Sequence, residues 1–587
     1  MPPNDRLVDP VELAKASHMR PGDPRVALFT EVSGLKRLQR VYEEVSHLHD
    51  IAFVKAVFQQ LELEMEVQAD QLAQVPHEGG LILVANHPYG AIDGMALVKV
   101  FGELRPDLKV MANFLLQQLR PLGHRFIGVN PFEQLRSASS FQGMRAALAH
   151  VKQGGALALF PAGEVSSWRT EFKAVADPRW KAPALKLVQH AGVPVVPVWF
   201  DGANSMVFQM LGMIHPNLRT LTLPNEMLRM RGRQVRMRIG KPIPAKELAA
   251  FTSAEQMGRY LRAKTYALGS GVQVRREQFK PLLFPRRPKE VVEAADPRLL
   301  EQELAGIRDL KLNSQAEFDL YLAGSERIPV MLREIGRLRE VTFRAVGEGT
   351  NKRIDLDEFD LYYDHLFLWD REKRRLVGAY RIGDGARIMP RYGRRGLYLS
   401  TLFRMDRAMD RVLRRSFELG RSFIAQEYQR HRLPLFMLWR GLLIHLTSNP
   451  AHQYLIGPVS ISSTYSHFSR ALIMAYVERH HYDRDMAAMV TPRNRFRVKR
   501  DGADSEALVQ ASEADMKKMD RLIAEIDPHE SAMPVLLKKY LLLNAKIIGF
   551  NCDPHFNDAL DGLMVLDLHK LPPRTVEDLR KGMAEGS

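Results

Sequence analysis

The stretch Leu81-Ile-Leu-Val-Ala85, which runs directly into Asn86-His87-Pro88-Tyr89-Gly90-Ala-Ile-Asp93, is the clearest structural signal in the N-terminal half. Five apolar residues followed by a turn rich in proline and glycine predict a buried strand that ends at the turn. Outward from it, strands are predicted at 61–67, 157–160, 193–200 and 234–239, and helices at 35–48, 146–151 and 184–190. This alternation of strands and helices predicts an α/β domain.

The C-terminal half predicts a second mixed α/β domain, with strands at 366–369, 376–382, 422–426 and 454–461. Residues from about 250 to 300 are charged and contain Pro281, Pro285 and Pro288, which is typical of a connection between domains. We therefore predict a helical segment over 1–60, an α/β domain over 61–250, connecting helices over 251–302 and a second α/β domain over 303–587.

The composition bears on where the protein works. Cys552 is the one cysteine, which fits a reducing compartment, and the N-terminal residues lack the apolar core of a signal peptide. No uninterrupted apolar run reaches the ~18 residues that a membrane-spanning helix needs. We expect a cytoplasmic protein held on the cytoplasmic face of the inner membrane, with the amphipathic helix at 35–48 as the first membrane-binding segment. The alternative is that this helix packs onto the domain that follows.

The formal net charge of +16 predicts an anionic partner. Charge alone leaves nucleic acid, anionic lipid and an acidic carrier protein open. The sequence contains no zinc-finger spacing, no RNA-binding signature and no stripe of interleaved aromatic and basic residues. We therefore expect no nucleic acid, and we expect no metal site.

His87 and Asp93 are the first candidates for catalysis. A histidine in the turn between a strand and a helix lies where α/β sheets place their chemistry. Acyl transfer to a hydroxyl needs a base that takes the proton while the acyl carbonyl is attacked, and a carboxylate that orients the imidazole. His87 and Asp93 provide these two groups, although such a pair alone is a common pattern.

Two further blocks strengthen this interpretation. Phe160-Pro161-Ala162-Gly163-Glu164-Val165-Ser166 follows the second strand, and Val193-Pro-Val-Val-Pro-Val198 forms the third. In this order and spacing the blocks resemble the glycerolipid acyltransferase family, over residues 60–245. The resemblance implies that His87 is the base and that Asp93 orients it. It also implies contacts to the substrate from Asn86, Gly90, Phe160, Pro161, Gly163 and Glu164.

Departures from that family bear on the acceptor. Five residues rather than four separate His87 from Asp93, and Ala162 occupies the place of the family's glutamate, with Glu164 two residues later. The arginines that hold an acceptor phosphate are missing, because residues 130–133 (Asn-Pro-Phe-Glu) and Val165-Ser166 stand at the matching places. Since a bidentate arginine commonly reads a phosphate, we expect an acceptor without glycerol phosphate.

The C-terminal half contains a second candidate set, formed by Arg339, Phe343, Asp355, Asp357, Asp360, Arg381, Glu418 and Arg421. Arg339 and Phe343 are four residues apart on a predicted helix and share a face. The order and spacing of the set resemble the acyl-homoserine lactone synthases, which have the fold of the GNAT N-acyltransferases and take acyl groups from acyl carrier protein.

N-acylation requires deprotonation of an ammonium and stabilisation of a tetrahedral oxyanion. Glu418 is the first candidate base, and Arg421 belongs with it to the catalytic pair. Asp357 and Asp360 are expected to hold the cation of the substrate. Further contacts to the substrate are expected from Arg339, Phe343 and Arg381.

The donor is predicted from an imperfect motif. The GNAT pyrophosphate loop, Arg/Gln-x-x-Gly-x-Gly/Ala, is approximated only by Arg394-Arg395-Gly396. This favours the phosphopantetheine thioester of acyl carrier protein over free coenzyme A, because the carrier lacks the nucleotide that the loop helps to hold. We expect no tightly bound cofactor.

A closer likeness, over residues 315–570, is to the ornithine lipid N-acyltransferases. It rests on Arg337-Leu-Arg-Glu-Val-Thr-Phe-Arg344, Gly347-Glu-Gly-Thr350, Leu536-Leu-Lys-Lys-Tyr540 and Gly549-Phe-Asn-Cys-Asp-Pro-His-Phe-Asn557. Two acyl-transfer domains in this order resemble the bifunctional ornithine lipid synthases. The resemblance implies N-acylation of ornithine with a 3-hydroxyacyl group, then O-acylation of the lyso-ornithine lipid by the N-terminal half. Another amino acid (glycine or lysine) and a membrane scaffold with a dead site are the alternatives.

Overall fold

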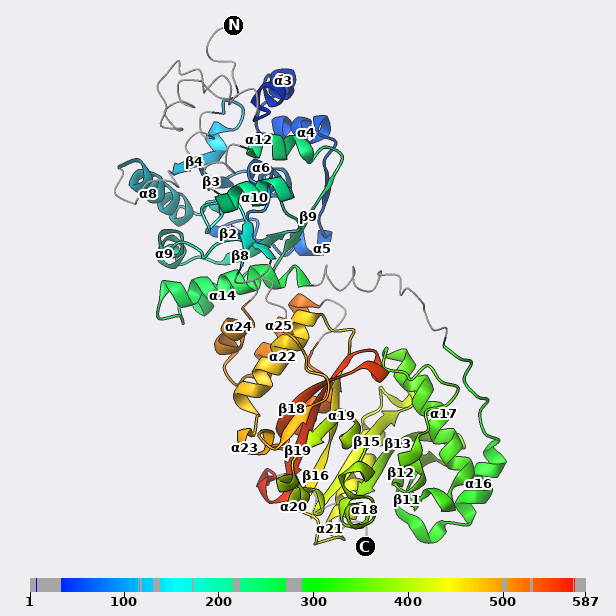
Figure 1. Cartoon of the computed structure of the whole chain (residues 1–587). Coiled ribbons are helices and arrows are strands. Elements are labelled where there is room, and N and C mark those ends of the chain that lie inside the picture. The colour runs from blue at the N-terminus through cyan, green and yellow to red at the C-terminus, as the bar shows by residue number, and fades with distance from the viewer. Residues whose placement is uncertain are drawn as a thin grey trace. The chain divides into compact units, whose positions relative to one another are not determined.

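The computed structural model describes residues 7, 33–113, 116, 119–129, 138–170, 174–214, 222–270, 288–498, 504–527, 532–573 and 575. The block at 130–133 lies outside the described residues. The chain divides into two units, Met1–Gln273 with Lys499–Glu513, and Val274–Val498 with Ala514–Ser587. Each unit has a mixed sheet and several helices, which confirms the predicted fold class of two α/β domains (Figure 1).

The N-terminal unit is built on a seven-stranded sheet in the order β1-β9-β8-β2-β5-β3-β4. Neighbouring strands are parallel except for β8 and β9. The strands are β1 (Glu64–Glu66), β2 (Leu81–Ala85), β3 (Lys109–Asn113), β4 (Phe126–Val129), β5 (Ala156–Leu159), β8 (Val195–Phe200) and β9 (Gln234–Ile239), with a separate hairpin of β6 (Ser167–Arg169) and β7 (Ala174–Ala176). Because β2, β5 and β8 are parallel, the turns that follow them lie at one edge of the sheet, and the first of these turns contains His87.

The helices of the N-terminal unit pack around this sheet. They are α3 (Leu35–Val45), α4 (Asp50–Gln60), α5 (Ala69–Leu72), α6 (Ala91–Phe101), α8 (Ala138–Lys152), α9 (Ala182–Ala191), α10 (Met206–Ile214), α12 (Leu223–Arg229), α13 (Ala245–Leu248), α14 (Ala254–Ala267) and α24 (Ser505–Ser512). α24 comes from the C-terminal half of the sequence, yet it packs against α14, and Arg259 pairs with Asp504 at 2.6 Å. No feature of the sequence indicated this return of the chain.

Two of these helices differ from what the sequence suggested. Tyr42 and Val45 of α3 are buried in the core, so its apolar face packs onto the unit and the packing alternative holds. α14 lies in the stretch predicted to connect the domains, and it packs against α9 and β8. Its buried residues Met257, Tyr260 and Leu261 recur at helical spacing, but the charged residues between them concealed this pattern.

The C-terminal unit is built on an eight-stranded sheet in the order β10-β11-β12-β13-β15-β16-β19-β18. All its neighbours are antiparallel except β15 and β16. The strands are β10 (Lys311–Gln315), β11 (Phe318–Gly324), β12 (Asp364–Asp370), β13 (Arg375–Asp384), β15 (Ser416–Ile424), β16 (Tyr454–Ile461), β18 (Lys546–Asp553) and β19 (Ala559–Asp567), with a separate pair of β14 (Phe403–Met405) and β17 (Val490–Pro492).

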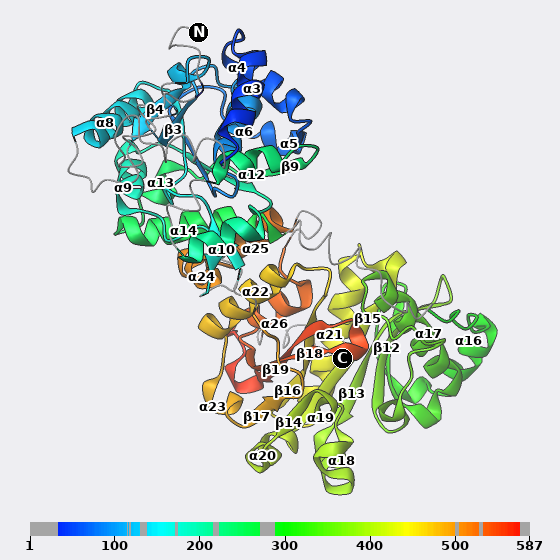
Figure 2. The same ribbon diagram turned by 45° about the horizontal axis from the view of Figure 1, so that its top comes forward.

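The helices of the C-terminal unit are α16 (Pro297–Ala305), α17 (Pro329–Ala345), α18 (Gly385–Tyr392), α19 (Leu399–Leu402), α20 (Asp410–Leu413), α21 (Arg432–Thr447), α22 (His467–His480), α23 (Arg484–Ala487), α25 (Met516–Ile526) and α26 (Val535–Leu542). α17 and α21 cover opposite faces of the sheet and can be followed in Figure 2. Tyr321 of β11 packs with α17, whereas the adjacent Leu320 faces Gly441 of α21. Within the described part of the chain, no helix is both long and apolar enough to cross a bilayer.

Candidate functional site

The turn after β2 brings His87 and Asp93 together. Gly90 has φ +88°, which a glycine adopts without strain, and α6 begins at the next residue. His87 Nδ1 lies 2.9 Å from Asp93 Oδ2, and the same oxygen accepts the main-chain N–H groups of Tyr89 at 2.9 Å and Gly90 at 3.0 Å. Because a carboxylate only accepts, Nδ1 carries the hydrogen of this bond, and Nε2 is left to act as a base.

Asp93 is fully buried in this arrangement, and its environment has opposing effects on its charge. Burial raises the pKa of Asp93, while the hydrogen bonds from His87 and the two main-chain N–H groups work in the other direction. The side chain of Asn86 holds the start of the turn, because it both donates to Phe200 O at 2.9 Å and accepts from Phe200 N at 2.7 Å. The turn is therefore tied to β8 as well as to α6.

The second block lies beside this pair. The ring of Phe160, at the end of β5, stacks on the ring of His87 with 4.0 Å between centroids. Gly163 N donates to Phe160 O at 2.9 Å, and Lys181 N donates to Pro161 O at 2.8 Å. The structure thus brings Phe160 into contact with His87 and places Pro161, Gly163 and the half-buried Glu164 in the turn that follows.

Asp177 and Ser166 hold the main chain of His87, a role that sequence reasoning missed. His87 N donates to Asp177 Oδ1 at 3.1 Å, Ser166 Oγ donates to the same oxygen at 2.5 Å, and Ser166 N donates to His87 O at 2.8 Å. These bonds form a closed ring around the histidine. Asp177 is 90 residues from His87 in sequence, and no motif near it signals the contact.

In the C-terminal unit, three arginines and three aspartates form a buried ionic network. Arg339 on α17 donates to both carboxylate oxygens of Asp360 at 2.9 and 3.0 Å and to Asp355 Oδ2 at 3.0 Å. Arg381 on β13 lies 2.5 Å from Asp357 Oδ1 and 3.2 Å from Asp360 Oδ2. Burial alone would raise the pKa of Asp360, but Arg339 and Arg381 hold it well below its ordinary value.

Arg421 completes this network from an unusual backbone position. It has φ +52°, and the register of β13 with β15 shifts there, so that Tyr380 opposes both Arg421 and Ser422 in a β-bulge. Its guanidinium lies 3.4 Å from Asp355 Oδ2 and 3.5 Å from Asp357 Oδ2. The ring of Phe556 also packs against it, and Phe556 meets Phe343 edge to face.

Glu418 is the most deeply buried group of the predicted catalytic pair. Its Oε2 accepts from Tyr363 Oη at 2.5 Å and Tyr398 N at 3.1 Å, and its Oε1 accepts from Leu399 N at 2.7 Å. Burial raises the pKa of Glu418 to about 7, although the bonds from Tyr363 and Leu399 lower it. A carboxyl that titrates near neutral pH inside an α/β unit has the basicity that a general base requires.

The strand that holds Glu418 corrects the sequence prediction. A strand was expected at 422–426, with Glu418 and Arg421 before it, but β15 begins at Ser416 and contains both residues. Gly420 and the charged residues around it concealed the strand. β15 pairs in parallel with β16 only from Ser416 to Glu418, so Glu418 lies where the two strands part.

The carboxyls of Glu348 and Asp553 lie near Asp561, which is also near Arg421, and sequence reasoning assigned this group no role. Asp561 on β19 accepts from Ser460 Oγ at 2.8 Å. Burial and repulsion from Asp553 and Glu348 raise the pKa of Asp561 to about 8, while Arg421 lowers it. Burial also raises the pKa of Glu348 to about 7. Glu348 stood in a quoted motif, whereas the two aspartates come from strands far along the chain.

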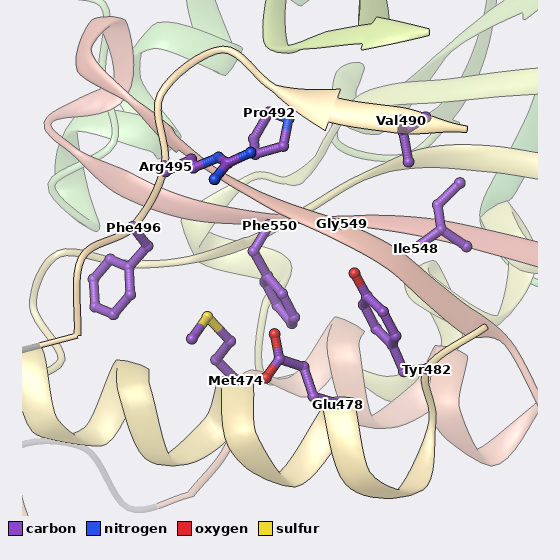
Figure 3. Close-up of a pocket in the computed structure, with 10 residues that line it drawn as sticks. All are labelled: Met474, Glu478, Tyr482, Val490, Pro492, Arg495, Phe496, Ile548, Gly549 and Phe550. Atoms are coloured by element: carbon purple, nitrogen blue, oxygen red, sulfur yellow. The ribbon is translucent and has the colours of Figure 1, made fainter. Parts of the chain in front are cut away.

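A cavity of about 310 Å³ opens between α22, β17 and β18. It is lined by Met474, Glu478, Tyr482, Val490, Pro492, Arg495, Phe496, Ile548, Gly549 and Phe550. Figure 3 shows Phe550, Met474 and Glu478 pointing toward one another, and burial raises the pKa of Glu478. None of these ten lining residues belongs to the two predicted sites.

Comparison with known proteins identifies the two halves. Residues 35–275 match an acyltransferase family, and residues 338–440 match an acetyltransferase (GNAT) domain. The chain is 32% identical over 217 residues to a glycine N(alpha)-acyltransferase of Bacteroides thetaiotaomicron, covering 35% of this chain and 63% of the relative. It is 29% identical over 283 residues to the protein of the same name from Phocaeicola vulgatus, covering 46% and 79%.

A third relative is named as an O-acyltransferase rather than an N-acyltransferase. The chain is 29% identical over 225 residues to a lyso-glycine lipid O-acyltransferase of Bacteroides thetaiotaomicron, covering 37% of this chain and 80% of the relative. The matched part of the chain spans 63% of the length of the first relative, which is less than two thirds. The two domain matches confirm the expected order of an acyltransferase domain followed by a GNAT domain. The chain therefore joins two domains of acyl-transferring enzymes, an acyltransferase domain in its N-terminal half and a GNAT domain in its C-terminal half.

Proposed function

We propose that the chain is a bifunctional aminolipid synthase, which N-acylates ornithine with a 3-hydroxyacyl group and then O-acylates the lyso-ornithine lipid. The observation that carries the proposal is a pair of bases, one in each half. His87 is hydrogen-bonded to the buried Asp93, and Glu418 has a pKa of about 7. The alternative of a scaffold with dead sites does not account for two bases with their hydrogen-bond partners in place.

In the first step, Glu418 takes a proton from the α-ammonium of the amino acid. The amine nitrogen then attacks the thioester carbonyl carbon, the C–N bond forms, and a tetrahedral oxyanion develops. Collapse of this intermediate breaks the C–S bond, and the proton that the nitrogen loses on becoming an amide is transferred to the departing thiolate. Arg421 lies within the same site and supplies positive charge beside the developing anion.

In the second step, His87 Nε2 takes the proton of the 3-hydroxyl group of the lyso-lipid. The oxygen attacks the carbonyl carbon of a second acyl thioester, the C–O bond forms and the C–S bond breaks, and the imidazolium returns the proton to the thiolate. Asp93 stabilises the imidazolium during this step through the 2.9 Å bond to Nδ1. Phe160 covers one face of the ring and limits its rotation.

Acyl carrier protein as donor is supported by the charge around the N-acyl site. Residues 387–415 contain nine arginines and two aspartates, and Arg404, Arg407 and Arg411 are among those exposed. The same segment contains Tyr398 and Leu399, whose N–H groups bind Glu418. Exposed arginines beside the base would steer an acidic carrier protein toward it. Arg394-Arg395-Gly396 belongs to a short 3-10 turn (Gly393–Gly396) ahead of α19.

Ornithine is proposed over glycine because of the carboxyls beside Arg421. A second ammonium group beside Asp561 and Glu348 would lower the raised pKa of both carboxyls and pair with their ionised forms; ornithine has this group and glycine lacks it. Glycine remains the specific alternative, since the relatives named above are a glycine N-acyltransferase and a lyso-glycine lipid O-acyltransferase. The proposal locates the enzyme on the cytoplasmic face of the inner membrane, because its acceptor and product are lipids.

The test is expression in a bacterial host that makes no aminolipid, fed in turn with ¹³C-labelled ornithine, lysine or glycine. Mass spectrometry of the extracted lipids should show a diacylated lipid that contains labelled ornithine. Label from glycine alone would replace ornithine by glycine in the proposal. Absence of any new lipid, with the protein folded and present, would favour the scaffold. The double variant His87→Ala/Glu418→Gln is the matched negative control.

A further inference from the structure

α10 has one face inside the N-terminal unit and one face in water. Phe208 and Gln209 are buried, whereas Met206, Val207 and Met210 are 75%, 52% and 56% exposed. The nine residues of α10 include no charged side chain. Large apolar side chains on one face of an uncharged helix are rarely left exposed to water, because removing their apolar area from water is favourable.

Trp168 extends this face. Its side chain is 43% exposed, and its main-chain N–H donates to Gln209 Oε1 at 2.8 Å, so β6 and α10 are held together. We define the α10 surface as Trp168, Met206, Val207 and Met210. Among the described residues of the N-terminal unit, no other large apolar side chain is as exposed as these four. Single exposed apolar residues are ordinary, but four gathered on two joined elements are not.

Both elements of this surface are attached to the turn that holds His87. Ser166, which donates its N–H to His87 O at 2.8 Å, lies two residues before Trp168. The segment that leads from β8 into α10 accepts a bond from the same turn, because Tyr89 Oη donates to Asp201 O at 2.7 Å. Whatever covers the α10 surface therefore lies next to the base of the O-acyl site.

We propose that the α10 surface inserts into the interface of a lipid bilayer and sets the His87 site against it. The inference rests on the proposed function in one respect, that the acceptor is a lipid. A bilayer is favoured over a protein partner because the helix is uncharged, and because tryptophan is enriched at the level of lipid head groups. α3, the first segment expected at the membrane, has its apolar side chains Tyr42 and Val45 buried in the core.

The position of Trp168 makes the proposal directly measurable. The protein has five tryptophans, and the other four, all within described residues, are at most 9% exposed. Addition of vesicles of phosphatidylethanolamine and phosphatidylglycerol to the full-length protein should shift the Trp168 emission to shorter wavelength. Lipids brominated near the head group should quench it. The variant Trp168→Phe should lack both changes, which assigns them to this residue.

The triple variant Met206→Gln/Val207→Thr/Met210→Gln tests the surface itself. Vesicle partitioning, measured by sedimentation, should weaken about 10- to 100-fold, because three apolar side chains no longer gain from burial. The matched control Val535→Gln/Leu542→Gln changes two exposed apolar residues of α26 in the other unit and should bind as the wild type does. Circular dichroism and an unchanged melting profile show that each variant is folded.

These binding measurements contain no substrate, so their failure is separate from a failure of the proposed function. Wild-type partitioning by the triple variant overturns the proposal. Vesicle binding without any change in Trp168 emission also overturns it, because another surface would then be responsible. A wild-type dimer that the triple variant abolishes, seen by sedimentation velocity without lipid, would assign the surface to a second copy of the chain instead.

Discussion

The buried carboxyl of Glu418 predicts that the variant Glu418→Gln loses activity and gains stability at pH 8. Glu418 is 2% exposed, and burial raises its pKa from an ordinary 4.5 to about 7. The folded state therefore binds the proton more tightly than the unfolded state does. A group of this kind makes the protein less stable as pH rises from 4.5 to about 7, and the loss is complete above that range. The difference between the two values corresponds to about 3 kcal/mol.

Glutamine removes this penalty, because it has the same shape and does not ionise. Part of this gain in stability is lost again. In the wild type, Glu418 Oε2 accepts from both Tyr363 Oη and Tyr398 N, whereas an amide nitrogen in its place accepts from neither. Tyr363 can rotate its hydroxyl, so about one hydrogen bond, or about 1 kcal/mol, is lost. We expect the C-terminal unit of the variant to be about 2 kcal/mol more stable than the wild type at pH 8. At pH 5 the advantage should be absent.

The same substitution should lower the rate of N-acylation by about 10²- to 10⁴-fold, the effect of a lost general base. The wild-type rate should rise with pH through about 7, as Glu418 loses its proton. Calorimetry at pH 5 to 8, with the fluorescence of Trp369 and Trp439 to identify the transition of this unit, measures the stability. Glu372→Gln, at an exposed carboxyl, is the control. Lower stability than the wild type at pH 8 would refute the argument from burial, and wild-type rates would refute the assignment of the base.

Three further outcomes follow from the two sites. His87→Ala should abolish ester formation and leave N-acylation intact, so lipid extracts should contain the monoacylated lyso-lipid; diacylated lipid at wild-type levels would remove His87 from the role of base. Asp177→Ala should lower kcat for O-acylation about 10- to 100-fold with little change in KM, because it removes the oxygen that accepts from His87 N and so loosens the main chain of the base without touching the acceptor; a change in KM alone would contradict this. Arg339→Ala should destabilise the C-terminal unit by about 3–5 kcal/mol, since it leaves the buried Asp360 with one arginine fewer, whereas Arg333→Ala on the exposed face of α17 should change it by about 0.5 kcal/mol or less. Thermal unfolding measures the stability of both variants. Equal melting temperatures for Arg339→Ala and Arg333→Ala would show that Arg339 does not stabilise the fold.

The strands that the sequence predicted most accurately have a clear apolar pattern, which is continuous in β2, alternates with polar residues in β9 and is mostly apolar in β16. β2, β9 and β16 begin and end at the predicted residues. The reason is that a strand buried in a sheet is mostly apolar, or alternates between apolar and polar residues, and that polar or glycine residues flank it. His87 and Asp93 could be paired for a related reason. They are six residues apart, so local chain geometry alone brings them together.

Contacts between distant segments could not be predicted in this way. Asp177 meets His87 only because β2, β5 and the β6–β7 hairpin converge, which no local pattern records. The aspartates of the C-terminal set show a second limit. Asp360 and Asp357 are equally acidic in the sequence, but Asp360 is enclosed by Arg339 and Arg381, while Asp357 is less deeply buried. Both carboxylates have arginine partners, Arg381 for each and Arg339 for Asp360, and only the three-dimensional arrangement shows this.

The two proposed bases illustrate how environment and residue type together determine where a base can stand. Imidazole has an ordinary pKa near neutrality, so a histidine can act as a base in a turn at the edge of a sheet, provided that a carboxylate fixes its orientation. A carboxyl is too acidic for this role in water and has to be moved into a site that disfavours its charge. His87 accordingly lies in a partly exposed turn, whereas Glu418 lies within a central strand of its sheet. An exposed glutamate in place of Glu418 would remain ionised at neutral pH and would be a poor proton acceptor for an ammonium. The depth of the proposed N-acyl base inside its unit is therefore what its chemistry requires, while Arg381 of the buried ionic network lowers the pKa of Glu418 and so favours its ionised form.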